Sequence, residues 1–309
     1  MKLRTALSAV AGGIGLTAAA NRLLRSRATE FPAPLEDDQR TIRWRGFDVA
    51  YTEAGDPDDP DLVLLHGINA VASSHEFAEV LDGLAETYHV VAPDLPGFGH
   101  SDRPPIRYSS SLYVTFVADF LDRVADDPTV VASSLTGAYA AKAASEDAVS
   151  RLVLINPTTD TIPGRNAWLM SLVRSPLVGE ALFNVVASKP SIRYFHADHG
   201  YDDTSKLTDE IVEYEWLSGH QPGARFAPAS FVSGYLDVEF DLEPLLADLE
   251  VPVTLVWGRN ADAPSLTDGQ ELAERADVRL VVVDRAALLP HVEHPKQFVD
   301  VVEEQISTV

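Results

Sequence analysis

The sequence predicts an α/β fold with a mostly parallel, doubly wound sheet and a helical cap inserted between two of its strands. Three observations lead to this prediction. Short apolar runs alternate with longer amphipathic stretches over most of the 309 residues, which is the pattern of strand–helix–strand units. The runs are rich in valine, leucine and isoleucine, as in strands that are buried on both faces. One long interval, residues 158–240, lacks such a run.

The first segment, residues 1–38, differs from the rest. Lys2 and Arg4 precede an apolar run, Thr5–Ala20, and three arginines follow it. Sixteen helical residues span about 24 Å, whereas a bilayer core is about 30 Å thick. The run therefore fits three alternatives: membrane association through residues 5–20, a helix packed on the protein, or a cleaved signal peptide. We expect a membrane-associated protein that faces the cytoplasm, with a cytoplasmic protein as the alternative.

The strands of the predicted sheet follow this segment. Thr41–Glu53 alternates polar and apolar residues around a turn at Arg45-Gly46, which predicts a hairpin. Six further apolar runs predict buried parallel strands. These runs are Leu62–Leu65, His89–Ala92, Thr129–Ala132, Arg151–Ile155, Val253–Trp257 and Arg279–Val283.

Amphipathic helical stretches separate the strands and also fill the long interval. We therefore expect residues 39–157 and 241–309 to form the α/β core, and residues 158–240 to form the cap. The stretches between strands include Ser73–Glu86, Ser110–Ala125 and Leu135–Ala144, and those in the cap include Trp168–Leu177 and Thr208–Leu217.

The charge balance excludes one class of function. The chain has 47 acidic and 24 basic residues, for a net charge of −23, so it lacks the basic surface that nucleic-acid phosphates require. A charge this large repels itself in dilute buffer and is screened by salt, and we interpret it as adaptation to a salty cytoplasm. The chain has no cysteine, which excludes disulfides and thiolate catalysis.

Three segments carry residues suited to chemistry. His66-Gly67 follows a predicted strand, and a glycine there lets backbone amides turn toward a reacting group. The second segment, 94–102, reads Asp-Leu-Pro-Gly-Phe-Gly-His-Ser-Asp. The third places Ser133-Ser134 between a strand and a helix, among mostly small residues.

In this order, the three segments resemble the α/β-hydrolase fold family. The resemblance covers about Thr41 to Val309 and is strongest over Leu62–Pro104. It implies a serine nucleophile at a sharp strand-to-helix turn, then an acid and a histidine later in the chain, and no cofactor or metal. It also implies that residues 158–240 are the helical cap that shapes the substrate pocket.

The resemblance places the nucleophile at Ser134. The family usually has glycine two residues before and two residues after the nucleophile, where this chain has Ala132 and Thr136. We therefore expect a somewhat relaxed turn. The oxyanion hole would be formed by the amides of Ile68 and Leu135. The alternative interpretation is that Ser134 only caps the following helix.

The acid also departs from the family pattern. The segment Trp257-Gly258 resembles the start of the family's Trp-Gly-x-x-Asp, but the aspartate position is occupied by Ala261. Asp262 is the next residue and is our candidate, with Asp160 as the alternative because it follows another strand. Asp262 can also be read as an exposed loop carboxylate.

The histidine is displaced as well. Aligned on the Pro-His-x-Glu-x-Pro segment that begins at Pro290, the family's general-base histidine falls on Leu288. His291, three residues further on, is our candidate base, with His294 as a weaker one; a chain with no functional histidine is the other alternative. A base must come within about 3 Å of the serine oxygen or act through one water.

Another histidine pair, His196 and His199, has the spacing of metal ligands on a helix. No third ligand supports a metal site, and Gly200 follows directly. We therefore expect this pair to lie in an exposed loop of the cap.

Two functions of different classes fit these residues. In the first, a hydrolase cleaves a small acyl substrate: Ser134 attacks, His291 takes the proton and Asp262 orients the imidazole. In the second, a degenerate member binds a small apolar ligand or a partner without turnover, because a serine without a base is a poor nucleophile. Leu288, Ala261 and Thr136 are the departures that favour the second.

Overall fold

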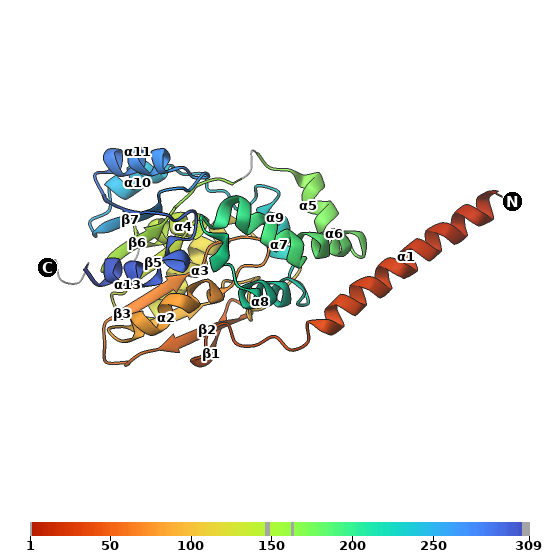
Figure 1. Ribbon diagram of the computed structural model, residues 1–309, viewed down its shortest axis with the longest axis horizontal. Coiled ribbons are helices and arrows are strands. Elements are labelled where there is room, and N and C mark those ends of the chain that lie inside the picture. Colours follow the sequence, from red (N-terminus) through yellow and green to blue (C-terminus); the bar gives the residue numbers. More distant parts are fainter. Residues whose placement is uncertain (1, 146–148, 162–163, 305–309) are drawn as a thin grey trace.

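An eight-stranded sheet forms the centre of the molecule, with helices on both faces (Figure 1). The computed structural model describes residues 2–145, 149–161 and 164–304, with side chains described from residue 15 onward. The strand order is β1-β2-β4-β3-β5-β6-β7-β8. The pairs β1–β2 and β2–β4 are antiparallel, and the other pairs are parallel. The fold class predicted from the sequence is confirmed.

Each strand predicted from an apolar run is present, and the bounds differ by at most three residues. The hairpin begins earlier than expected, at Asp38, because the polar residues before Thr41 continue the pairing with β2. The strands are β1 (Asp38–Trp44), β2 (Phe47–Ala54), β3 (Asp61–Leu65), β4 (His89–Pro93), β5 (Thr129–Ser133), β6 (Arg151–Ile155), β7 (Val253–Gly258) and β8 (Arg279–Val283).

Two apolar layers hold helices against the sheet. Side chains alternate between the faces of a strand, so in β3 Val63 and Leu65 join one cluster while Leu62 and Leu64 join the other. The first layer packs against α3 (Ser110–Val124), α4 (Leu135–Ala144), α10 (Leu242–Ala247) and α11 (Leu266–Ala276). The second packs against α2 (Ala78–Ala85), which follows the 3₁₀ turn η1 (Ser74–Phe77), and against α13 (Pro295–Glu304), which follows α12 (Pro290–Glu293).

A group of short helices lies between β6 and α10 and covers one end of the sheet (Figure 1). Within residues 164–240 the structure describes no strand, as the sequence predicts for the cap. A separate apolar cluster, which includes Phe183, Ile192 and Val212, holds these helices together. The elements are α5 (Ala167–Arg174), α6 (Val178–Val186), α7 (Lys189–Phe195), η2 (His196–Gly200), η3 (Thr204–Lys206), α8 (Asp209–Gly219) and α9 (Phe226–Phe231).

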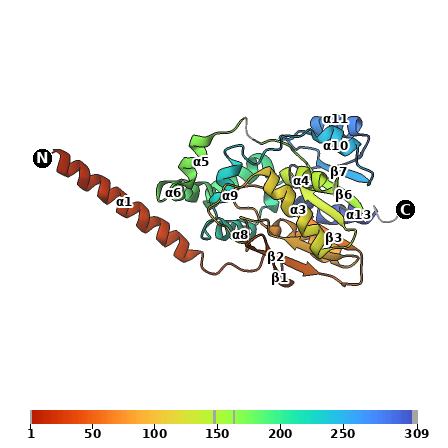
Figure 2. The same cartoon turned by 180° about the vertical axis from the view of Figure 1, so that it is seen from behind.

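The N-terminal segment forms one long helix, α1 (Lys2–Arg27), which projects away from the body on the side of the cap (Figures 1 and 2). The last turns of the helix contact the protein, where Asn21 donates to the Leu177 carbonyl at 3.1 Å. Among the described residues, no single helix has both the length and the apolar character needed to cross a membrane. The consecutive helices α5 and α6, which are bent by 96° relative to one another, meet both criteria only when they are taken together.

Candidate active site

The sheet topology gathers the predicted site residues at one edge. Parallel strands all end at the same edge of a sheet, where ligands bind in open α/β folds. His66-Gly67 follows β3, Ser134 follows β5, Asn156 follows β6 and Asp262 lies beyond β7. The cap lies over this end of the sheet (Figure 1).

Ser134 occupies a strained turn between β5 and α4. Its dihedral angles are φ 53° and ψ −129°, a region that side chains other than glycine seldom enter and that costs about 1–3 kcal/mol. The expected relaxation of this turn is therefore absent. Thr136 is accommodated because it is fully buried and its hydroxyl donates to the His66 carbonyl at 2.8 Å.

The two residues expected to supply the oxyanion hole lie against this turn. Leu135 is the first residue of α4, where backbone amides have no acceptor within the helix. Ile68 follows Gly67, and a Cβ atom added to Gly67 would lie 3.6 Å from the Ser134 Cβ. The absence of a side chain at Gly67 thus lets the loop after β3 approach the serine closely.

His291 lies in the core and faces a different partner. Its ring is fully buried, with the rings of Phe77 and Phe298 at centroid distances of 5.3 and 5.6 Å. The Nε2 atom lies 3.1 Å from Oε1 of Glu76, within ion-pair distance, but neither ring nitrogen makes a hydrogen bond within the described residues. The Ser134 hydroxyl likewise makes no hydrogen bond in the part of the chain that the structure describes.

The sequence did not predict Glu76, a carboxylate that lies against Gly67. Oε2 of Glu76 accepts the Gly67 amide at 2.9 Å. The same oxygen, the Ser133 hydroxyl and the Ser134 Cβ lie 3.3, 3.2 and 3.6 Å from the point that a Gly67 Cβ would occupy. The only sequence signal was an acidic residue in a stretch of small and apolar residues, which is too common to single out a site.

The surroundings of Glu76 keep it ionised. Burial alone would raise the pKa of this carboxyl, but the His291 imidazole and the Ser133 hydroxyl beside it outweigh burial and hold the pKa below its usual value. The Glu76 carboxylate is thus ionised at neutral pH.

The two acid candidates lie away from His291. Asp262 and Asp160 are both exposed, and Asp262 pairs through its backbone with Ser265. The Asp262 carboxylate makes no hydrogen bond or ion pair within the described residues. The structure therefore does not assemble Ser134, His291 and Asp262 as a hydrogen-bonded triad, because an exposed loop cannot reach a ring buried between Phe77 and Phe298.

Leu288, at the position where the family places its histidine, is held by a neutral side chain. Asn156 is fully buried at the end of β6 and donates its Nδ2 to the Leu288 carbonyl at 2.8 Å, while its Oδ1 has no partner within the described residues. His294, the weaker candidate, contacts the Arg285 carbonyl at 2.9 Å. It therefore stabilises the loop rather than the serine.

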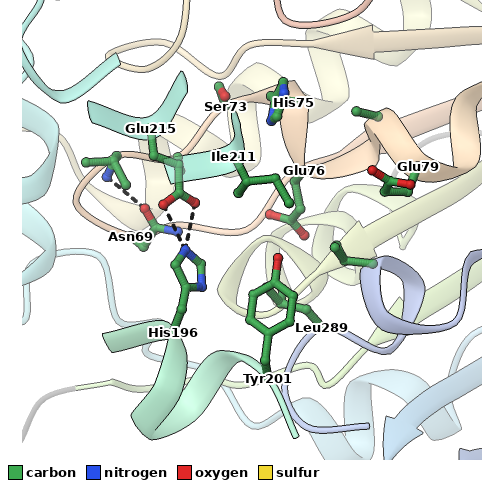
Figure 3. Close-up of a pocket in the computed structure, with 14 residues that line it drawn as sticks. Asn69, Ser73, His75, Glu76, Glu79, His196, Tyr201, Ile211, Glu215 and Leu289 are labelled. Carbon is green, nitrogen blue, oxygen red and sulfur yellow. Dashed lines mark hydrogen bonds and ion pairs between the residues drawn. The ribbon is translucent and has the colours of Figure 1, made fainter. Parts of the chain in front are cut away.

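A pocket opens between the core and the cap beside Glu76 (Figure 3). Glu76 and the hydroxyl end of Tyr201 point toward one another across it. Burial lowers the pKa of His75 to about 4, so this ring is neutral at pH 7. The carboxylates of Glu76, Glu79 and Glu215, the Tyr201 phenol and the imidazoles of His75 and His196 thus line the pocket together with apolar side chains.

His196 also lines the pocket, and its position differs from the exposed loop that the sequence predicted. It is mostly buried, and its Nε2 lies 2.8 Å from both carboxylate oxygens of Glu215. Burial would lower the pKa of His196, but the Glu215 carboxylate raises it above its usual value. The expectation of an exposed loop is correct for His199, which pairs with Asp198, and wrong for His196. Within the described residues no group of three or more side chains is arranged to hold a metal.

Comparisons with known proteins agree on one family. Residues 62–301 match the model of the alpha/beta hydrolase family. The pimeloyl-[acyl-carrier protein] methyl ester esterase of Aeromonas hydrophila is 27% identical over 253 residues, which are 79% of this chain and 94% of that protein.

Solved structures show the same fold. A 2-hydroxy-6-oxo-6-phenylhexa-2,4-dienoate hydrolase from Rhodococcus has a TM-score of 0.73 at 21% identity and covers 88% of this chain and 99% of its own. A membrane phospholipase A, described as a bacterial virulence factor, has a TM-score of 0.69 at 23% identity. It covers 99% of this chain and 98% of its own. At these identities the likeness concerns the fold alone.

Proposed function

The chain belongs to the alpha/beta hydrolase family, and we propose that it is a cofactor-free hydrolase of esters or related small acyl compounds with Ser134 as its nucleophile. The observation that carries this proposal is the strained backbone of Ser134 at the end of β5. Strain of this kind persists where the surrounding structure requires it, most often at functional sites. The family's hydrolases, and the esterase from Aeromonas hydrophila among the relatives, support a hydrolytic reaction.

We assign the proton transfer to Glu76 rather than directly to His291. Ser134 Oγ attacks the acyl carbon, and its proton passes through one water to the Glu76 carboxylate, because the two groups share no direct hydrogen bond. The carbonyl oxygen becomes an oxyanion held by the amides of Ile68 and Leu135. The Glu76 carboxyl returns the proton to the departing alcohol. Water then cleaves the acyl-enzyme, giving one proton to Glu76, which restores the Ser134 hydroxyl.

His291 has a positioning role in this scheme. Its Nε2 lies 3.1 Å from one oxygen of Glu76, and the Gly67 amide donates to the other, so these two contacts orient the carboxylate. The general-base position thus moves from the loop that contains Leu288 to the residues that follow β3. Asp262 has no part in this scheme.

Labelling with a fluorophosphonate probe tests the nucleophile. We expect purified protein in concentrated salt to be labelled, and Ser134→Ala to lose the label. Ser133→Ala is the matched control, because it removes the neighbouring hydroxyl and leaves the turn in place; it should keep most of the labelling. Labelling that survives Ser134→Ala, or disappears in Ser133→Ala instead, would overturn the assignment.

The pH dependence of labelling distinguishes Glu76 from a histidine base. The pKa of Glu76 lies below its usual value, so the carboxylate stays ionised between pH 6 and 8 and the labelling rate should be flat over that range. A histidine base would instead make the rate rise through about pH 6.5. Glu76→Gln should slow labelling by about 10²–10⁴-fold while thermal unfolding shows a folded protein.

A second candidate function rests on the neutral residues at the family's histidine position. Leu288 cannot accept a proton, and the buried Asn156 donates to the Leu288 carbonyl. A protein of this kind would bind a small apolar ligand without turnover. This second function predicts that the fluorophosphonate probe does not label folded wild-type protein. It also predicts that Ser134→Ala leaves the thermal stabilisation by an apolar ligand unchanged.

A further inference from the structure

Exposed apolar side chains gather on one side of the molecule. In the described part of the chain, nine of the ten large apolar side chains that are strongly exposed lie on α1, α5, α6 and α7; Ile106 is the exception. We call the residues on α5, α6 and α7 the apolar cap face. They are Trp168, Val178, Leu182, Val185, Val186, Tyr194 and Phe195, and the two on α1 are Leu16 and Leu23.

The apolar cap face is unusual in its degree of exposure. Trp168 is 71% exposed, Val185 67% and Tyr194 61%. Single exposed apolar residues are common on soluble proteins, but a contiguous group on adjacent helices marks a surface that contacts another apolar phase or molecule. The group also lies on helices that are held together by their own cluster, in which Phe183 and Ile192 are buried.

The charge of the same segments is opposite to that of the rest of the chain. Residues 1–29 and 165–195 contain nine of the 24 lysines and arginines but only one of the 47 acidic residues. Lys189 and Arg193 pair with acidic residues of α8, whereas Arg22 and Arg27 are exposed. A basic surface beside exposed aromatic and aliphatic side chains matches the chemistry of an anionic bilayer surface.

Polar contacts join α1 to the cap. Asn184 donates to Asn21 at 3.1 Å, and Arg25 forms an ion pair with Glu180 at 3.0 Å. Gln221 donates to the Ala28 carbonyl at 2.7 Å, just beyond the end of the helix. The last turns of α1 are thus fixed beside α6, and the rest of the helix projects from the same side of the molecule (Figures 1 and 2).

We propose that α1 and the apolar cap face form one docking surface for an anionic lipid bilayer. Exposed tryptophan and tyrosine suit the interface between headgroups and acyl chains. The apolar run of α1 spans about 24 Å at 1.5 Å per residue, which suits a helix lying in that interface more than one crossing a core of about 30 Å. This docking does not depend on the hydrolase reaction.

Vesicle flotation tests the lipid partner. Full-length protein is mixed with phosphatidylglycerol vesicles or with phosphatidylcholine vesicles and separated on a density gradient. We expect strong flotation with the anionic vesicles and weaker flotation with the neutral ones. Added salt should reduce the difference, because it screens the attraction between arginines and headgroups.

Two sets of substitutions locate the surface. The triple variant Trp168→Ser, Val185→Ser and Tyr194→Ser should lose flotation on both kinds of vesicle. Arg22→Gln with Arg27→Gln should lower the partition to anionic vesicles by about 30-fold, since each basic residue near the surface contributes about 1 kcal/mol. The matched control, Arg259→Gln with Arg279→Gln, changes the charge equally just after β7 and in β8, and should float like wild type.

The outcomes separate lipid from a second copy of the chain. Absence of flotation by folded wild-type protein, or equal flotation of all variants, would contradict the proposal. Light scattering in the absence of lipid gives the oligomeric state. A wild-type dimer that becomes monomeric in the triple variant, without flotation of either, would assign the apolar cap face to self-association and overturn the lipid assignment.

Discussion

Asp94 shows how a single carboxylate organises the residues around the candidate site. It is buried and accepts hydrogen bonds from the Ser74 amide and hydroxyl at 2.8 and 2.9 Å and from the His100 amide at 2.7 Å. Burial alone would raise its pKa, but these donors and the nearby imidazoles hold the pKa at about 2. Gly99 lies against it with φ +48°, and a Cβ there would come within 2.0 Å of the carboxyl carbon.

Gly99→Ala should therefore destabilise the protein by about 3 kcal/mol or more, because it combines a left-handed backbone with displacement of a buried, hydrogen-bonded carboxylate. Gly46→Ala is the control: Gly46 also has positive φ, but a Cβ there meets no atom within 4 Å. It should cost about 1–2 kcal/mol. Urea unfolding of the two variants measures the difference, and equal costs would refute the steric argument.

The residues of the candidate site were only partly predictable from sequence. Ser134 follows from the small residues around it and from its place between a strand and a helix. The environment of His291 could not be predicted from local sequence, because its partner Glu76 is more than 200 residues earlier in the chain. Local motifs fix which segments reach the edge of the sheet, whereas the contacts of a buried ring depend on how α12 packs against η1 and α13.

At the scale of elements, apolar runs and capping residues carried most of the information. The strands were predictable because they are continuously buried, as β4, β5 and β7 show. The ends of the helices were less predictable. Trp168–Leu177 was expected to be one stretch, but α5 ends at Arg174 because Ser175 precedes a proline and takes an extended conformation.

The first turn of α11 offers a test of capping. The Ser265 hydroxyl accepts the Asp268 amide at 3.3 Å, and Asp268 accepts the Ser265 amide at 2.8 Å, which is a reciprocal capping box. Ser265→Ala should lower the free energy of unfolding by about 1 kcal/mol. Thr267→Ala, on the exposed side of the same helix, should change it by less than about 0.5 kcal/mol. Chemical unfolding checks both, and similar values would argue against the cap.

At the scale of the whole molecule, net charge should govern stability. The charge of −23 repels itself in the compact state, and the Debye length falls from about 10 Å at 0.1 M salt to about 3 Å at 1 M. The melting temperature should therefore rise by several degrees between dilute buffer and about 1 M KCl, and more slowly above that concentration.

Differential scanning calorimetry measures this rise, with sucrose at equal osmolality as the uncharged control. Screening predicts that KCl stabilises at concentrations where sucrose has little effect. A melting temperature that responds equally to both solutes, or that rises only in multimolar KCl, would show that charge repulsion does not limit the stability of the fold.

The attachment of α1 has a mechanical consequence. The long helix contacts α6 of the cap, through Asn21 and Arg25, rather than the sheet. A force applied along α1 therefore reaches the cap first and the α/β core only through it and through the segment before β1. With α1 immobilised, any movement between the cap and the core would therefore displace the core, which is the larger part of the molecule.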